Sequence, residues 1–159
     1  MRLQKKLIFV TALIGTTIGS SVVNSQPLGI YEYAVKFVCG VVGQSSVLAR
    51  GVYFTAINVH NQSNESVELR KRIAIALPSE RAGKVSEFFT ASLKPDEALE
   101  IDCPDILRHV GSEQQRLVKG FVVIQSKVEL DVVGVYTAAP SIAGTVIALE
   151  IDRIPARKK

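Results

Sequence analysis

Apolar and polar residues alternate in short segments along this chain, and that period of two limits the fold more than any other feature of the sequence. In residues 31–42, the clearest segment, the odd positions are apolar: Tyr31, Tyr33, Val35, Phe37, Cys39 and Val41. Glu32 and Lys36 lie at even positions. Such alternation indicates a β-strand with one buried face. Because no segment shows a sustained period of 3.6, the sequence predicts an all-β protein.

Further runs with strand character follow, separated by turn residues. They are residues 51–60, 67–77, 86–93, 98–103, 117–126, 129–137 and 145–154. Pro104 begins a segment that reaches only to Gly111, which predicts one short helical turn. We therefore predict a single-domain antiparallel β-sandwich of about eight strands, immunoglobulin-like in general architecture. A flattened barrel is the alternative, because strand order cannot be read from one sequence.

Residues 51–60 and 117–126 are apolar on both faces, which is typical of central strands. A short link separates residues 117–126 from residues 129–137, so these two strands are expected to form a hairpin. Residues 78–84 (PSERAGK) are expected to form a loop.

The domain is predicted to span residues 26–154. In its last strand, one set of alternating residues is expected to face the core: Ile147, Leu149 and Ile151. Glu150 and Asp152 are expected to face solvent. Residues 155–159 (PARKK) have too little apolar content to dock against the domain, and we expect a flexible basic tail.

The first 25 residues have the features of a secretory signal peptide. A basic start, an apolar stretch and a small polar end occupy residues 2–6, 7–18 and 19–25. Val23 and Ser25 fit the two recognition positions of a cleavage site, which predicts a mature chain that begins at Gln26. An uncleaved anchor is the alternative, but threonine, glycine and serine shorten the apolar run below the roughly 20 residues that cross a bilayer. After cleavage, no stable membrane span is expected.

Cys39 and Cys103 are the two cysteines of the chain. In an exported protein a pair of cysteines usually forms a disulfide. Both residues also fall on predicted inner faces of their strands, which favours a buried Cys39–Cys103 bridge. Two buried free thiols are the alternative.

Four segments of the chain resemble a group of small exported bacterial proteins of uncharacterised function. They are YAVKFVCG in the 31–40 region, GVYFTAINVHN (51–61), ALEIDCPDI (98–106) and KGFVVIQSKVELDVVGVYTA (119–138). The resemblance implies a bacterial envelope or secreted location and the same two-cysteine framework. It implies no activity, cofactor or catalytic residue. In strand pattern alone, the chain is also similar to single-domain bacterial sandwiches such as the sensory rhodopsin transducer.

His60 and His109 are the histidines of the chain, and no nucleophile motif accompanies them. The acidic run from Glu97 to Asp105 lacks the glycine and bidentate glutamate of a calcium loop. Arg70, Lys71 and Arg72 are interpreted as part of a solvated strand face. The Asn-x-Ser sequences in residues 61–66 are interpreted as turn residues. We therefore expect no catalytic residue, no metal site and no cofactor.

The net charge of +4 does not indicate binding to nucleic acid, because the positive charge is concentrated near the two ends of the chain. These end residues are Arg2, Lys5, Lys6, Arg153, Arg157, Lys158 and Lys159. The rest of the chain has more acidic than basic residues. We predict a non-enzymatic exported module that binds an unidentified protein in the bacterial envelope or outside the cell. The alternatives are a surface glycan-binding module and a hydrolase built around His60.

Overall fold

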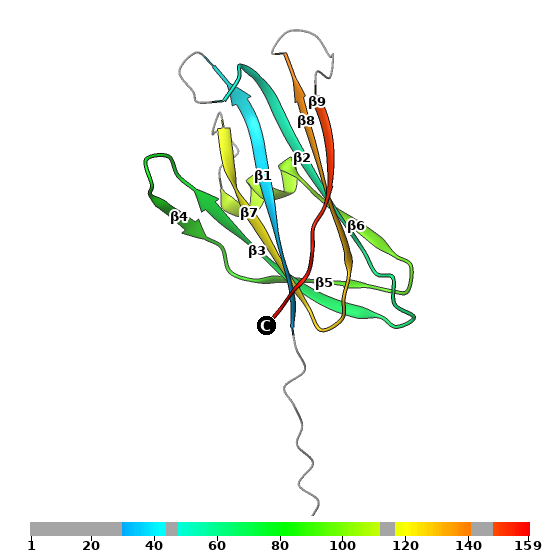
Figure 1. Cartoon of the computed structure of the whole chain (residues 1–159). Coiled ribbons are helices and arrows are strands. Elements are labelled where there is room, and N and C mark those ends of the chain that lie inside the picture. Colours follow the sequence, from blue (N-terminus) through cyan, green and yellow to red (C-terminus); the bar gives the residue numbers. More distant parts are fainter. Residues whose placement is uncertain (1–29, 44–47, 112–116, 141–147) are drawn as a thin grey trace, which may run out of the picture.

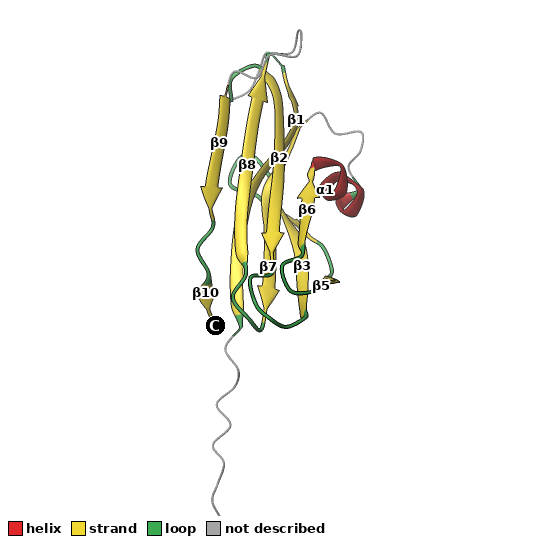
Figure 2. Ribbon diagram, turned by 90° about the vertical axis from the view of Figure 1, so that its right-hand side faces the viewer, coloured by secondary structure: helices red, strands yellow, loops and turns green. Residues whose placement is uncertain are grey.

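Residues 30–43, 48–111, 117–140 and 148–159 are described by the structure, a computed structural model. The predicted signal peptide lies outside the described residues. The described chain forms an antiparallel β-sandwich with one short helix, the predicted fold class. Ten strands belong to one continuous sheet, and this sheet folds over to make the two layers seen in Figures 1 and 2.

The first layer has the strand order β4 (Ala82–Val85), β3 (Val67–Ala76), β7 (Leu117–Ser126) and β1 (Tyr31–Val42). Two short strands extend it: β5 (Phe89–Leu93) pairs with β3, and β10 (Arg157–Lys158) pairs with the start of β1. The second layer has the order β6 (Ala98–Asp102), β2 (Gly51–His60), β8 (Asp131–Ala139) and β9 (Ala148–Arg153). β7 and β2 each lie between other strands, as predicted for central strands.

The two layers meet where the end of β1 pairs with the start of β2, over residues 40–42 and 51–53. Gly40 has a φ of 120°, a backbone conformation that side chains with a Cβ rarely adopt. The alternation of buried and exposed side chains shifts by one residue at this glycine. Cys39, at an odd position, and Val42, at an even position, are therefore both buried. Gly40 thus allows one strand to serve both layers.

The core lies between the layers. It is formed mainly by alternating residues of β1, β2, β3, β7 and β8, including Val35, Phe37, Ile57, Val59, Ile73, Val122, Ile124 and Val132, each at most 1% exposed. Tyr33, also buried, links the layers: its Oη accepts a hydrogen bond from Leu130 N (2.6 Å) and donates one to Leu130 O (2.9 Å). Burial raises the pKa of the Tyr33 phenol, so it remains protonated as a donor.

The helix α1 (Cys103–Val110) is longer than the single turn predicted. Asp102 caps its N-terminus, accepting a hydrogen bond from Asp105 N (3.0 Å), while the Asp105 carboxylate accepts one from Asp102 N (3.4 Å). Gly111 ends the helix in a left-handed conformation. Ile106 is fully buried in the core. Figure 2 shows α1 beside β6, on the side of the sandwich away from β9.

Two predictions were wrong, the hairpin of residues 117–126 with residues 129–137 and the loop at residues 78–84. β7 pairs with β1 and β3, whereas β8 pairs with β2 and β9, so they do not form a hairpin. The link between them crosses from one layer to the other, and Leu130 in this link is buried. The expected loop at residues 78–84 contains the start of β4, which pairs with the end of β3.

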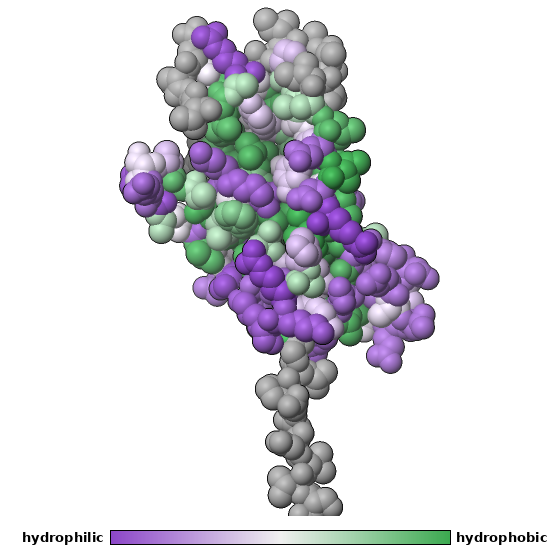
Figure 3. All heavy atoms as spheres, in the orientation of Figure 1, coloured by the Kyte–Doolittle hydropathy of each residue, from purple (hydrophilic) through white to green (hydrophobic). Residues whose placement is uncertain are grey.

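The last strand and the C-terminal segment also differ from expectation. Leu149 and Ile151 are 62% and 65% exposed, because β9 is at the sheet margin and its apolar residues lie on the outer face of the second layer. Figure 3 shows hydrophobic side chains at the right-hand edge of the surface, at the height of β9. Ile147 lies outside the described residues. Residues 155–159 contain β10 and do not form a flexible tail: Lys159 N donates to Ile30 O (2.9 Å), and Ile30 N donates to Lys159 O (3.2 Å).

No helix among the described residues is long and apolar enough to cross a membrane.

Candidate functional site

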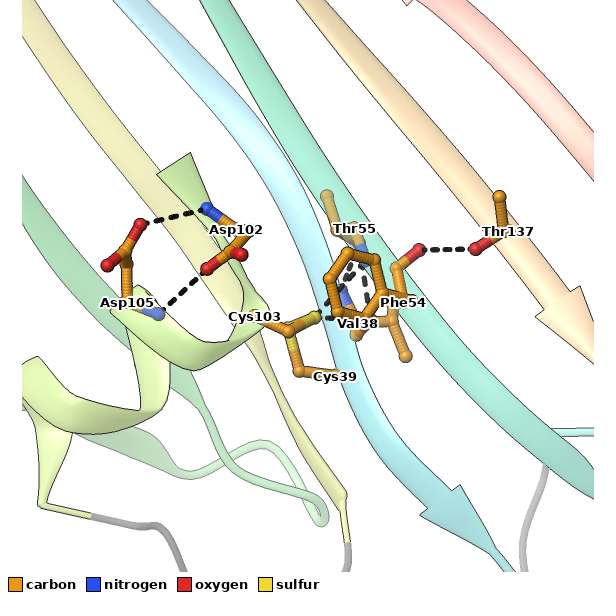
Figure 4. Close-up of a disulfide and its surroundings, with 8 residues drawn as sticks. All are labelled: Val38, Cys39, Phe54, Thr55, Asp102, Cys103, Asp105 and Thr137. Atoms are coloured by element: carbon orange, nitrogen blue, oxygen red, sulfur yellow. Dashed lines mark hydrogen bonds between the residues drawn. A yellow bond between two sulfur atoms is a disulfide. The ribbon is translucent and has the colours of Figure 1, made fainter. Parts of the chain in front are cut away.

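The two cysteines form a buried structural link. A disulfide joins Cys39 in β1 to Cys103 at the start of α1, with their Cα atoms 5.5 Å apart. Thr55 of β2 lies beside it, where its backbone N donates to Cys103 Sγ (3.2 Å) and its Oγ1 donates to Val38 O (3.2 Å) (Figure 4). Cys39 and Cys103 are 0% and 4% exposed. The bridge therefore ties the helix to the first layer and presents no surface to a substrate.

The histidines have separate surroundings. His60 Nε2 lies 3.9 Å from Asp96 Oδ1 at the end of β2. The His109 ring stacks on Phe89, with the ring centroids 3.9 Å apart. Within the described ranges, no group of three or more His, Cys, Asp or Glu side chains is arranged to hold a metal ion.

The acidic run and the Asn-x-Ser turn have structural contacts. Glu97 accepts a hydrogen bond from Lys94 N (2.8 Å), and Asp102 and Asp105 cap α1. Asn61 is fully buried, and its Nδ2 donates to three backbone carbonyl oxygens, those of Glu65, Leu93 and Lys94. Asn61 thus fastens the turn after β2 to the turn after β5.

The basic cluster is divided between the two faces of β3. Arg70 and Arg72 lie on the outer face, each with its guanidinium carbon 4.6 Å from the centre of the Phe88 ring. Lys71 lies on the opposite face, 5.5 Å from the centre of the Phe89 ring, and burial lowers the pKa of its amine. The cluster therefore is not one continuous cationic surface.

A polar network on the outer face of the first layer, with Glu32 and Gln125 buried at its centre, was not predicted. Gln125 Nε2 donates to Glu32 Oε2 (2.6 Å), Lys159 Nζ donates to the same oxygen (2.7 Å), and Arg70 Nε donates to Gln125 Oε1 (2.7 Å). A pocket of about 230 Å³ adjoins Arg70 and Gln125. Because these side chains bind one another, we interpret the network as structural.

The outer face of the second layer carries an exposed apolar surface, which we call the β9 face. Its members come from matching positions of three strands: Val52, Phe54 and Ala56 of β2, Val133, Val135 and Thr137 of β8, and Leu149 and Ile151 of β9. Phe54 and Val52 are 40% and 38% exposed, and Leu149 and Ile151 are the most exposed members. An exposed, contiguous apolar patch on a sheet is typical of a protein-binding surface.

The edge of β9 that faces away from β8 pairs with no strand of the described chain. Ile154 N donates to Val132 O (2.8 Å), which fixes the direction of the backbone groups in the ladder. Because hydrogen bonding alternates along an antiparallel pair, Glu150 and Asp152 direct their backbone groups toward β8. Leu149, Ile151 and Arg153 direct theirs away. An edge of this kind can accept a further strand.

The other face of β9 is acidic and borders a hollow. Glu150 and Asp152 lie opposite Tyr136 and Gly134 of β8. A shallow hollow of about 640 Å³ at the end of this face is lined by Tyr53, Tyr136, Thr137, Ala138, Ala148, Leu149 and Glu150. Tyr53 Oη donates to Ala49 O (2.7 Å). The Tyr136 phenol lies over Gly134, where a Cβ atom would come within 2.7 Å of its oxygen.

Comparisons with known proteins do not assign the chain to a family. No family model matches the chain, and no curated protein matches it. Among solved structures, the crystal structure of Thermotoga maritima 1070 is similar with a TM-score of 0.47 and 9% sequence identity, over 80% of this chain and 92% of that one. At this level the similarity carries no inference about function.

Proposed function

We propose that this protein is an exported, non-enzymatic module that acts by binding another protein through the β9 face, in the bacterial envelope or outside the cell. The observation that carries the proposal is the combination of exposed Leu149 and Ile151 with an edge that no described strand covers. Natural proteins usually protect such edges, so an open apolar edge favours a binding role.

Export is supported by the disulfide and by the signal-like first 25 residues. The intact mass of the protein recovered from the exporting cell tests this part of the proposal. We expect a mass that begins at Gln26. A mass of the full chain, recovered from the cytoplasm with two free thiols, would contradict export.

Site-specific photo-cross-linking in the producing cell tests the protein contact. A photoreactive amino acid is placed at Leu149 on the β9 face, and the matched control is placed at Phe121, which is 41% exposed on the outer face of the first layer. We expect a discrete adduct with another protein from position 149 that is lost when Ile151→Lys is added. No adduct at position 149, or the same adducts from both positions, would contradict the proposal.

Binding to a surface glycan is a second candidate, favoured by one observation. Tyr53 and Tyr136 line the hollow beside β9 together with Glu150, and aromatic rings with a nearby carboxylate are suited to sugar recognition. A glycan array probed with the wild type and with Tyr136→Ala tests it. Binding that depends on Tyr136 supports this candidate, and a blank array counts against it.

A further inference from the structure

The two faces of β9 differ in chemistry. Leu149 and Ile151 lie on the outer face with Thr137 and Val135, whereas Glu150 and Asp152 lie on the opposite face. The basic residue of β9, Arg153, is paired: its Nε lies 2.9 Å from Asp131 Oδ1. A strand added to the free edge would therefore meet apolar side chains on one face and two carboxylates on the other.

A second copy of this chain fits that edge poorly. Two antiparallel β9 strands related by a two-fold axis place residues of the same face opposite each other. When the pairing is centred on residue 150, 151 or 152, the residues directly opposite each other include Glu150 with Glu150, Glu150 with Asp152, or Asp152 with Asp152, respectively. Like charges directly opposite each other destabilise strand pairing. The acidic face thus disfavours self-pairing and favours a partner with the opposite charge.

The hollow beside β9 fits the same partner. Tyr53, Tyr136 and Glu150 line it, and the rings of tyrosines attract a cation while the carboxylate pairs with it. Burial, followed by the charges of Asp152 and Glu150, raises the pKa of the Tyr136 phenol, so the negative charge of β9 acts in this hollow. The side chain that best fits here is that of lysine or arginine.

We propose that the partner docks as an extended segment along β9, with apolar side chains over Leu149 and Ile151 and alternating basic side chains beside Glu150 and Asp152. This inference rests on the proposed function, because it takes the β9 face to be the protein contact. The main-chain groups of Leu149, Ile151 and Arg153 supply the hydrogen bonds, and the alternation of the partner supplies the specificity.

The test uses blocked peptides as long as β9 that alternate valine with lysine, or valine with glutamate as the matched control. The full mature chain should bind the lysine peptide at least about tenfold more tightly, since two cross-strand charge pairs change from attractive to repulsive. In the Glu150→Lys/Asp152→Lys variant the preference should reverse. Glu150→Gln/Asp152→Asn should remove it, and near-UV circular dichroism verifies that each variant is folded.

An unchanged preference in the charge-reversed variant would overturn the inference, as would a dimer of the wild type that forms through β9 and is dissociated by Ile151→Lys. The failure of the proposed function is distinguishable, because it appears as the absence of the cross-link at position 149. If position 149 gives a cross-link but the protein binds the lysine and glutamate peptides equally well, the protein contact through the β9 face stands. Only the inference that the partner is basic and alternating is then contradicted.

Discussion

Asn61 shows how one side chain determines the local structure of a turn. Its Nδ2 group donates to the carbonyl oxygens of three residues, and its Oδ1 accepts from Ser63 N (3.0 Å). Asn61→Ala leaves these buried groups without partners, so we expect it to reduce the free energy of unfolding by about 1–3 kcal/mol. Asn64→Ala, at an exposed position of the same turn, should stay within about 0.5 kcal/mol of the wild type. Urea denaturation measures both, and an equal effect of the two changes would contradict this role.

Glu32 makes stability depend on pH. Burial raises the pKa of its carboxyl, but the hydrogen bonds from Lys159 and Gln125, with the charges of Lys159 and Arg72, outweigh burial and lower it overall. A carboxyl whose pKa is lower in the folded state contributes stability above its unfolded pKa and loses that contribution as the pH falls through its folded pKa. We therefore expect the stability difference between wild type and Glu32→Gln to shrink on acidification.

Measurements of the free energy of unfolding across the acidic range check this prediction. Lys159→Met removes the hydrogen bond and charge that favour the ionised form, so it should weaken the same pH dependence. Parallel stability curves for wild type and Glu32→Gln would rule out Glu32 as the source.

At the scale of elements, the disulfide joins parts that are separated by 64 residues. A bridge over such a span destabilises the unfolded chain by restricting it, so Cys39→Ala/Cys103→Ala should reduce the free energy of unfolding by about 2–5 kcal/mol. Reduction of the wild type should have a similar effect. Two reactive thiols in the unfolded, unreduced protein would show that the bridge is absent from the purified material.

The alternation of apolar and polar residues in the sequence predicted the strands that bury one face in the core. The strands from Tyr31 to Val42 and from Gly51 to His60 have the predicted ends. Both cysteines are buried as predicted, but Cys103 is the first residue of α1 and does not belong to the strand predicted over residues 98–103. Strand pairing depends on contacts between distant residues, which the pattern of one segment does not report. The short link between β7 and β8 therefore resembled a hairpin turn, although it crosses from one layer to the other. β10 has no apolar pattern of its own, and its pairing with β1 depends on the backbone.

The β9 face could not be predicted from the same signal. Leu149 and Ile151 alternate with Glu150 and Asp152 as they would in a buried strand, and alternation does not state which face of a marginal strand is covered. The exposure of β9 follows from its pairing with β8 alone among the described strands, and that pairing depends on contacts between distant residues.

For the whole molecule, exposure separates residues that hold the sandwich together from residues available for binding. Ile57 is fully buried between the layers, whereas Ile151 is 65% exposed on the β9 face. Ile57→Ala should reduce the free energy of unfolding by about 2–5 kcal/mol. Ile151→Ala should change it by less than about 0.5 kcal/mol, because its side chain is mostly in water. Thermal and urea denaturation measure both, and comparable losses would show that the β9 face is covered in the folded protein.

Residue-resolved amide hydrogen exchange of β9 in the isolated protein tests the open edge most directly. The amides of Glu150, Asp152 and Ile154 face β8 and should be protected. Those of Leu149, Ile151 and Arg153 face away and should exchange rapidly. Protection that alternates in this way supports a strand whose outer edge is free to bind a partner. Equal protection of both sets would show that the edge is already paired, and it would contradict the β9 face as the binding surface.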